Sequence, residues 1–124
     1  MRAFGELEAT VMNLIWDKNG ADRTVRDVYE LIRRDREIAY TTVMSTMDNL
    51  HRKGWLSRVR EGKAYLYRAI QSREEHGASL MKEALSTSGR TELVLTHFLE
   101  HMTDSESKAL RHALQEVSGK TPQS

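Results

Sequence analysis

Two segments near the N-terminus repeat apolar residues with the spacing of a helix. The pattern predicts a first helix over residues 6–18, ended by Asn19-Gly20, because both residues tolerate the left-handed conformation of a helix C-terminus. A second helix is expected to begin at Thr24, whose hydroxyl caps the first turn together with Asp27, and to end in the charged run 33–37. The first apolar stripe is Leu7, Val11, Leu14 and Ile15 with Trp16 beside it, and the second is Val25, Val28, Leu31 and Ile32.

A third helix is predicted from about Ala39 to Lys53, ended by Gly54. Its apolar residues fall in one narrow sector of a helical wheel and are expected to be buried. The opposite side carries short hydroxyls and an amide, where lysine and glutamate normally provide solubility. The apolar sector is Ala39, Val43, Met47 and Leu50. The polar face is Thr41, Ser45, Asp48 and Arg52, flanked by Thr42 and Asn49.

After Gly54 the pattern changes from a helical period to strict alternation. Residues 55–60 and 64–70 alternate as two strands, and residues 61–63 form the turn, in which Gly62 supplies a positive φ. Helices followed by a hairpin with a basic tip predict a winged helix-turn-helix. The expected fold class is therefore mostly α with a small β-hairpin wing (α+β).

The rest of the chain predicts a second unit made of three helices. Its first helix begins at Ser72, which forms a capping box with Glu75, and its second spans about residues 90–102. Thr103 and Glu106 form another capping box at the start of the third. The expected domains are a winged-helix DNA-binding domain (1–71), a helical dimerisation domain (72–118) and a flexible tail (119–124).

The middle helix of this second unit is apolar around more than half of its circumference. Short neighbouring helices cannot cover such a surface, whereas a second copy of the same segment can. We therefore expect homodimerisation through residues 72–118; the alternative is that these helices pack back on the winged helix as one monomeric core. The predicted interface is Leu80, Leu93, Val94, Leu95, Phe98, Leu99, Met102, Leu110 and Leu114.

Charge is distributed unevenly, although the formal net charge of the 124 residues is only +1. Residues 33–68 carry nine basic and four acidic side chains, a local net charge of +5. Residues 71–124 carry six basic and eight acidic side chains, a local net charge of −2. The basic segment favours a polyanionic partner, although a solvated surface has the same composition.

Other features of the composition exclude several classes of protein. No segment approaches the ~20 apolar residues of a membrane span, and no apolar leader follows Met1, so a cytoplasmic location is expected. The sequence has no cysteine, which excludes disulfides, thiolate metal sites and cysteine nucleophiles.

The polar face of the third helix fits the reading of DNA bases. Small hydrogen-bonding side chains near the start of a recognition helix allow close approach to base edges, while basic groups around it hold phosphates. Asp48 would repel DNA, so we expect it to turn toward Arg52. The predicted base contacts are Tyr40, Thr41, Thr42, Ser45 and Asn49. The predicted phosphate and wing contacts are Thr24, Arg26, Arg52, Lys53, Arg60 and Lys63.

Three stretches of the sequence also resemble a known family, the penicillinase and methicillin-resistance repressors (BlaI/MecI). They are Leu7–Trp16, Ala39–Val43 and Leu50–Leu56, and the order of elements agrees from about Leu7 to Val117. The tail helix that holds residues 93–98 is part of the likeness.

The resemblance implies a homodimer on pseudo-palindromic operators that represses genes of the β-lactamase type. In that family a membrane β-lactam sensor with a zinc protease cuts the repressor in its dimerisation segment, which weakens bivalent binding. The matching position here is the bond between His97 and Phe98. Relatives cut by the staphylococcal sensors carry asparagine before that phenylalanine, so cleavage of this chain is a hypothesis.

The segment His97-Phe98-Leu99-Glu100-His101 spells H-x-x-E-H, the inverted zinc-peptidase signature. A catalytic zinc site also needs a third rigid ligand and a substrate cleft, and Phe98 and Leu99 are better used in a dimer core. We therefore expect no enzyme, no metal, no cofactor and no small-molecule ligand. His76 and His112 are expected at the surface.

Two other interpretations stay open from the sequence. The chain also fits a winged-helix regulator of another regulon that answers to a different signal. It fits as well a winged-helix protein-interaction module, in which the polar face of the third helix is incidental.

Overall fold

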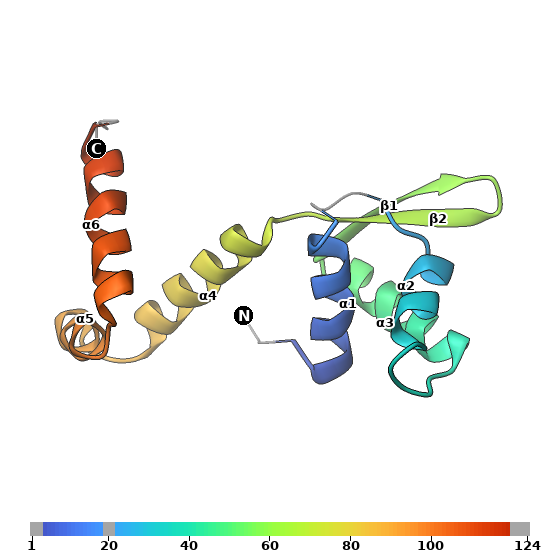
Figure 1. Ribbon diagram of the computed structural model, residues 1–124, viewed down its shortest axis with the longest axis horizontal. Helices are drawn as coiled ribbons and strands as arrows, with labels where there is room; N and C mark the ends of the chain where they lie inside the picture. Colours follow the sequence, from blue (N-terminus) through green and yellow to red (C-terminus); the bar gives the residue numbers. More distant parts are fainter. Residues whose placement is uncertain (1–3, 19–21, 120–124) are drawn as a thin grey trace. The chain divides into compact units, whose positions relative to one another are not determined.

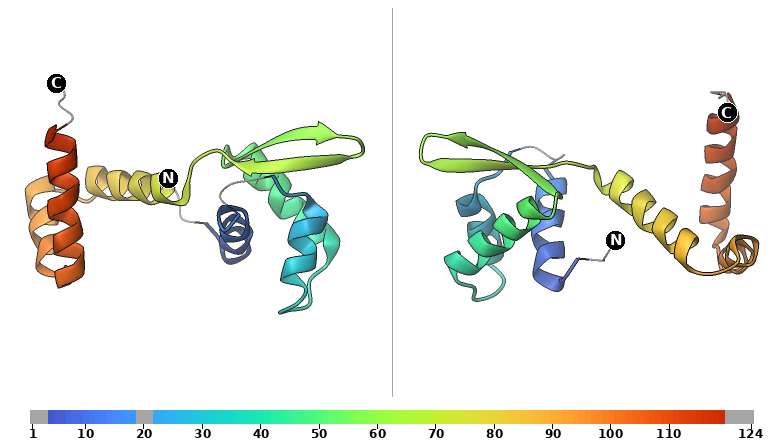
Figure 2. Two further views of the ribbon diagram at one scale, coloured as in Figure 1. Left: turned by 45° about the horizontal axis from the view of Figure 1, so that its top comes forward. Right: turned by 180° about the vertical axis from the view of Figure 1, so that it is seen from behind.

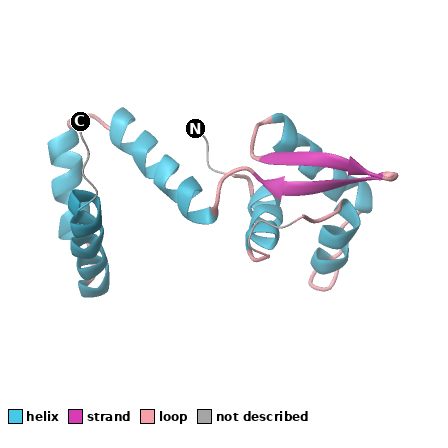
Figure 3. Cartoon of the chain, turned by 90° about the horizontal axis from the view of Figure 1, so that it is seen from above, coloured by secondary structure: helices cyan, strands magenta, loops and turns pink. Residues whose placement is uncertain are grey.

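The computed structural model describes residues 4–18 and 22–119, and its contacts divide the chain into two compact units, Met1–Leu80 and Met81–Ser124. Over the described residues the chain is helical apart from one hairpin, as Figures 1 and 3 show. The division falls inside α4 (Arg73–Thr87), whose first turns belong to the first unit. The predicted fold class, mostly α with a small β-hairpin, is confirmed.

The first unit begins with α1 (Glu6–Trp16), α2 (Val25–Ile32) and α3 (Tyr40–Arg52). Thr24 and Asp27 form the predicted capping box at the start of α2. The Asp27 amide donates to Thr24 Oγ1 at 3.0 Å, and the Thr24 amide donates to Asp27 Oδ2 at 2.9 Å. These bonds satisfy two amides that the helix itself leaves free, which fixes where α2 begins.

The core of this unit forms where α1, α2 and α3 meet the root of the hairpin. The predicted apolar sector of α3 is buried, with one exception. Ala39 is exposed because it is the N-cap of α3, with an extended backbone (φ −81°, ψ 144°), so its side chain leaves the helical sector. The buried residues are Val11, Met12, Ile15, Val28, Ile32, Val43, Met47, Leu50, Leu56 and Tyr67.

The hairpin consists of β1 (Leu56–Glu61) and β2 (Ala64–Ala69), paired antiparallel (Figure 2). Gly62 in its turn has φ 64°, as predicted, a conformation that a side chain would strain. Arg23 pairs with Tyr67 through two backbone hydrogen bonds of 2.8 and 3.0 Å. This bridge ties β2 to the segment before α2 and completes the winged helix-turn-helix.

His76, in the first turns of α4, is buried, so the prediction that it lies at the surface is wrong. Only 7% of it is exposed, because aromatic rings from distant parts of the chain surround it. The Phe4 ring stacks on it with centroids 4.5 Å apart, and the rings of Trp55 and Trp16 lie at 5.1 and 5.4 Å. These contacts fasten the start of α4 to the first unit.

Charged residues on the elements around His76 are paired with one another. Arg73 Nη2 lies 2.8 Å from Asp17 Oδ1 after α1, and Lys53 Nζ lies 2.8 Å from Glu8 Oε2. Nδ1 of His76, in contrast, is buried with no hydrogen-bond partner among the described residues. Burial lowers the pKa of His76 below its ordinary value of 6.5, because a charged ring would lose its hydration.

We expect the first unit to lose stability as the pH falls below 6.5, the ordinary pKa of this histidine. The unfolded chain then binds a proton that the buried ring does not, so the contribution of His76 is complete above that pH and is lost toward its lowered pKa. The effect is at most about 1.4 kcal/mol per pH unit. Thermal melting of the wild type and of His76→Phe, at several pH values, measures it.

The His76→Phe protein keeps an aromatic ring in the cluster but cannot titrate, so its melting temperature should fall less on acidification. His112→Phe is the matched control, because His112 is exposed on α6. An equal pH dependence in the wild type and in His76→Phe would contradict the assignment.

The second unit contains the end of α4, followed by α5 (Thr91–Glu100) and α6 (Asp104–Gly119). Gly89, with φ 94°, lies in the turn between α4 and α5. The predicted capping box of Thr103 and Glu106 is confirmed, with hydrogen bonds of 2.9 and 3.1 Å. No residue of α5 or α6, as far as the structure describes them, is buried within the single chain.

Two predicted chain features fall on residues outside the described part. The helix end assigned to Asn19-Gly20 is one, and α1 ends earlier, at Trp16. The tail is the other: α6 includes Gly119, the first residue assigned to the tail, while residues 120–124 lie outside the description.

Candidate nucleic-acid interface

The exposed side of α3 carries hydroxyl groups that have no partner among the described residues. Thr41, Thr42 and Ser45 are exposed, and no described residue forms a hydrogen bond with their hydroxyls. The hydroxyl of Thr46, one residue further on, donates instead to the Thr42 carbonyl at 2.8 Å. The free hydroxyls therefore lie on the face that sequence analysis assigned to base contacts.

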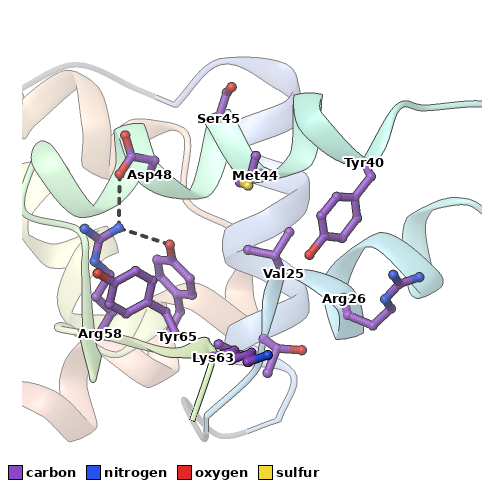
Figure 4. A pocket seen from close by; sticks show the side chains of 12 residues that line it. Val25, Arg26, Tyr40, Met44, Ser45, Asp48, Arg58, Lys63 and Tyr65 are labelled. Atoms are coloured by element: carbon purple, nitrogen blue, oxygen red, sulfur yellow. Dashed lines mark hydrogen bonds and ion pairs between the residues drawn. The ribbon is translucent and has the colours of Figure 1, made fainter. Parts of the chain in front are cut away.

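A hollow of about 670 Å³ lies between α3, the start of α2 and the hairpin (Figure 4). It brings together predicted base contacts from α3 and predicted phosphate contacts from α2 and the wing. Its walls combine aromatic rings with cationic groups, a mixture suited to a polyanionic backbone. The residues that line it are Thr24, Val25, Arg26, Tyr40, Met44, Ser45, Asp48, Arg58, Lys63, Ala64, Tyr65 and Tyr67.

Tyr40 is held at one end of this hollow by residues of α2. Its ring lies edge-on to that of Tyr29, with centroids 5.3 Å apart, and the Arg26 guanidinium lies 5.1 Å from its centre. Arg26 also pairs with Glu30 at 3.4 Å, an exposed contact that contributes little. The hydroxyl oxygen of Thr24 accepts from the Asp27 amide and the Thr24 amide donates to the Asp27 carboxylate, so both groups are engaged in capping α2.

Asp48 pairs with two arginines on the exposed side of α3. The predicted contact with Arg52 is present, at 3.2 Å between Nε and Oδ2. A second contact was not predicted: Arg58 Nη1, from β1, donates to Asp48 Oδ1 at 3.0 Å. The hydrogen bond from Arg58 is the main reason why the pKa of the Asp48 carboxyl lies below its ordinary value. The carboxylate is thus neutralised where it would otherwise repel phosphates.

Arg52 and Lys53, at the end of α3, were predicted to contact phosphates, but both form contacts within the protein. Arg52 bonds to the Asn49 side-chain oxygen as well as to Asp48, which leaves the Asn49 amide group free to donate. Lys53 pairs with Glu8 of α1, and this hydrogen bond lowers the pKa of the Glu8 carboxyl. Lys53, like Arg52, is therefore already engaged within the protein.

Arg60 and Lys63 are exposed near the tip of the hairpin. Within the described residues neither forms an ion pair, and the Arg60 guanidinium lies 5.3 Å from the centre of the Tyr65 ring. Both charges are therefore available to an external anion.

Three residues of this face were missed by sequence analysis: Met44, Arg58 and Tyr65. Met44 is 43% exposed beside Ser45, although methionine is more often buried. Its spacing from Thr41 and Ser45 was the signal that places it on the exposed face. Arg58 and Tyr65 follow the alternation of the hairpin, but alternation does not reveal that their side of the hairpin faces α3.

Most of the predicted dimer residues in the second unit are exposed in the single chain. Between 42% and 59% of Leu93, Leu95, Phe98, Leu99 and Leu114 is exposed. Val94, Met102 and Leu110 are half-buried, as is Leu80, which belongs to the first unit. Exposed apolar groups in this number are typical of a surface that another protein covers.

The H-x-x-E-H segment lies in α5 and its C-cap. Nδ1 of His97 is 3.4 Å from Glu100 Oε1, and Nδ1 of His101 is 2.9 Å from the His97 carbonyl oxygen. Both polar contacts stay within the helix. The bond between His97 and Phe98 lies inside α5, and both residues are exposed.

The fold and this face define a class, the winged helix-turn-helix regulators. A family model described as penicillinase repressor matches residues 4–116. The chain is also 37% identical over 116 residues to transcriptional regulator BlaI from two strains of Mycobacterium tuberculosis, which covers 91% of the chain and 83% of those proteins. The chain thus belongs to the penicillinase repressor family of transcriptional regulators. This family is not enzymatic, which agrees with the prediction that the chain is no enzyme.

Solved structures of other regulators are also similar. A MarR family protein from Bacillus stearothermophilus matches 96% of this chain and 76% of its own, with 18% identity and a TM-score of 0.48. The PcaV regulator from Streptomyces coelicolor matches 94% and 76%, with 20% identity and a TM-score of 0.47. None of the described helices is long and apolar enough to cross a membrane.

Proposed function

We propose that the protein is a homodimeric repressor that binds pseudo-palindromic operator DNA. One observation carries this proposal: the hydroxyls on the exposed side of α3 have no partner among the described residues, and they lie beside a hollow lined by Arg26, Arg58 and Lys63. Repression of β-lactamase-type resistance genes is the function that family membership favours.

In this proposal α3 enters the major groove with its N-terminal half. The hydroxyls of Thr41, Thr42 and Ser45 both donate and accept, so they suit base edges, and the threonine methyls suit thymine methyls. The Asn49 amide group donates to an acceptor on a base or a phosphate. Tyr40, at the helix start, contacts the backbone or a base face.

Lys63, at the wing tip, is proposed to contact a phosphate. Replacing it with alanine should weaken binding to all DNA sequences alike and lower the slope of log affinity against log salt by about one. Titrations with operator and unrelated DNA at several salt concentrations measure both effects. A loss confined to the operator would contradict a phosphate contact.

Association through α5 and α6 would give a dimer with two DNA-binding domains, one for each half of the operator. The partner we propose is a second copy of the same surface, because a twofold interface pairs each patch with the identical patch of the other copy and covers both. Two linked domains bind a palindromic site far more tightly than one, because the second contact is intramolecular.

We propose further that cleavage between His97 and Phe98 by a membrane β-lactam sensor relieves repression. A protease needs an extended substrate, so α5 must unwind locally, and no described residue of α5 is buried to oppose this in the free chain. Incubation with the cognate sensor and β-lactam tests the idea. An intact chain would remove it while leaving the DNA-binding proposal in place.

The decisive experiment is a gel-shift titration on the DNA upstream of the protein's own gene, with unrelated competitor DNA and two salt concentrations. We expect a discrete complex of two chains per site that survives the competitor, and footprinting then locates the operator. Smeared, salt-sensitive binding without preference would contradict the proposal and favour a protein-interaction module.

A further inference from the structure

Arg58 connects the wing to α3 and to the core at the same time. Its Nη1 donates to Asp48 Oδ1 at 3.0 Å, a bond drawn dashed in Figure 4, and also to the Tyr67 hydroxyl at 3.2 Å. Its guanidinium also lies 4.1 Å from the centre of the Tyr65 ring. Tyr67 is only 2% exposed, so one end of this network is anchored in the core.

The root of the hairpin is also held by the backbone bridge of Arg23 with Tyr67 and by an ion pair of 2.9 Å between Arg68 and Asp22, but both of these contacts lead to the segment before α2 and not to α3. Arg60 and Lys63 are exposed and have no ion-pair partner in the described structure. A two-stranded hairpin is marginally stable by itself, so its orientation depends on contacts at its root. The side chain of Arg58 is 23% exposed, which strengthens its ion pair relative to a fully solvated one.

We propose that Asp48 and Arg58 are positioning residues that hold the wing against α3, so that one DNA duplex meets both elements together. The inference rests on the proposed DNA-binding function and assigns neither residue a base contact. It accounts for a carboxylate on the DNA-facing side of α3: its charge is used to hold the wing rather than to meet DNA.

The positioning role and simple electrostatics predict opposite effects of Asp48→Ala on the affinity for operator DNA. Removing a negative charge from this face should tighten DNA binding if charge alone matters. Positioning predicts weaker operator binding, on the order of tenfold, comparable to the loss of one charge-assisted hydrogen bond. Asp48→Asn, which keeps one acceptor for Nη1, should fall between. The assay is anisotropy titration of the full chain on the footprinted operator.

Glu61→Ala is the matched control, because Glu61 is exposed at the end of β1 and has no ion pair among the described residues. It removes the same charge from the wing without touching the network, so it should bind as tightly as the wild type or more tightly. Circular dichroism melting shows whether each variant is folded, as expected for changes at exposed or half-buried positions.

The energetic coupling between Asp48 and Lys63 in DNA binding distinguishes positioning of the wing from a merely structural role of Asp48, which would not change it. If the pair of Asp48 and Arg58 positions the wing, Lys63→Ala should lower the operator affinity and the slope of log affinity against log salt in the wild-type background. Both decreases should be much smaller in the Asp48→Ala background. Additive effects, or tighter binding by Asp48→Ala, would overturn the positioning role. Wild-type protein without operator preference would instead overturn the proposed function itself.

Discussion

Replacing Leu95 with aspartate should give a folded monomer that has lost most of its operator affinity. Leu95 is 42% exposed in α5, among the apolar side chains that we propose a second copy covers. A carboxylate buried in that interface without a partner would be costly, so the dimer dissociates. The loss of bivalency then lowers operator affinity by about 10²- to 10⁴-fold.

Sedimentation or size exclusion with light scattering gives the oligomeric state, and anisotropy gives the affinity. Ser88→Asp is the control, because it adds the same charge in the exposed turn between α4 and α5. A Leu95→Asp protein that is still fully dimeric would place the interface elsewhere. A monomer with undiminished operator affinity would show that dimerisation is not needed for binding.

The second large effect concerns base reading by α3. Ser45→Ala and Thr41→Ala should each relax the preference for particular operator base pairs, at a cost of ~1–3 kcal/mol. The reason is that each removes a hydroxyl with no partner among the described residues, on the exposed side of the helix. Binding to a set of operators with single base-pair changes measures the loss position by position.

Thr46→Ala is the control for this experiment. Its hydroxyl donates to the Thr42 carbonyl within the same helix, so removing it should leave the base preference unchanged. An unchanged preference in both the Thr41 and the Ser45 variants would overturn the assignment of the recognition face.

Local features of this fold could be predicted from the sequence because they depend on neighbouring residues. The capping box of Thr24 with Asp27 is present, as is that of Ser72 with Glu75. The turn at Gly62 is also present, because a positive φ is a property of a single residue. The exposed face of α3 followed in the same way from helical periodicity.

Contacts between distant segments could not be predicted in this way. His76 is buried because Phe4, Trp16 and Trp55 converge on it, and no periodic pattern within α4 signals that convergence. The partner of Asp48 on α3 was found by helical spacing. Its partner Arg58 on β1 was not, since that contact depends on the angle between a helix and a hairpin.

The pairing of the hairpin also bears on the colloidal behaviour of the protein. β1 pairs with β2 along one edge, and in the described structure the other side of β2 is bridged at Tyr67. An unpaired strand edge can recruit a strand from another molecule unless charge opposes the approach. Arg60, which is exposed on β1 and has no ion pair among the described residues, places that charge there. Arg60→Ala should therefore aggregate more readily as well as bind DNA less, and light scattering measures the aggregation without DNA.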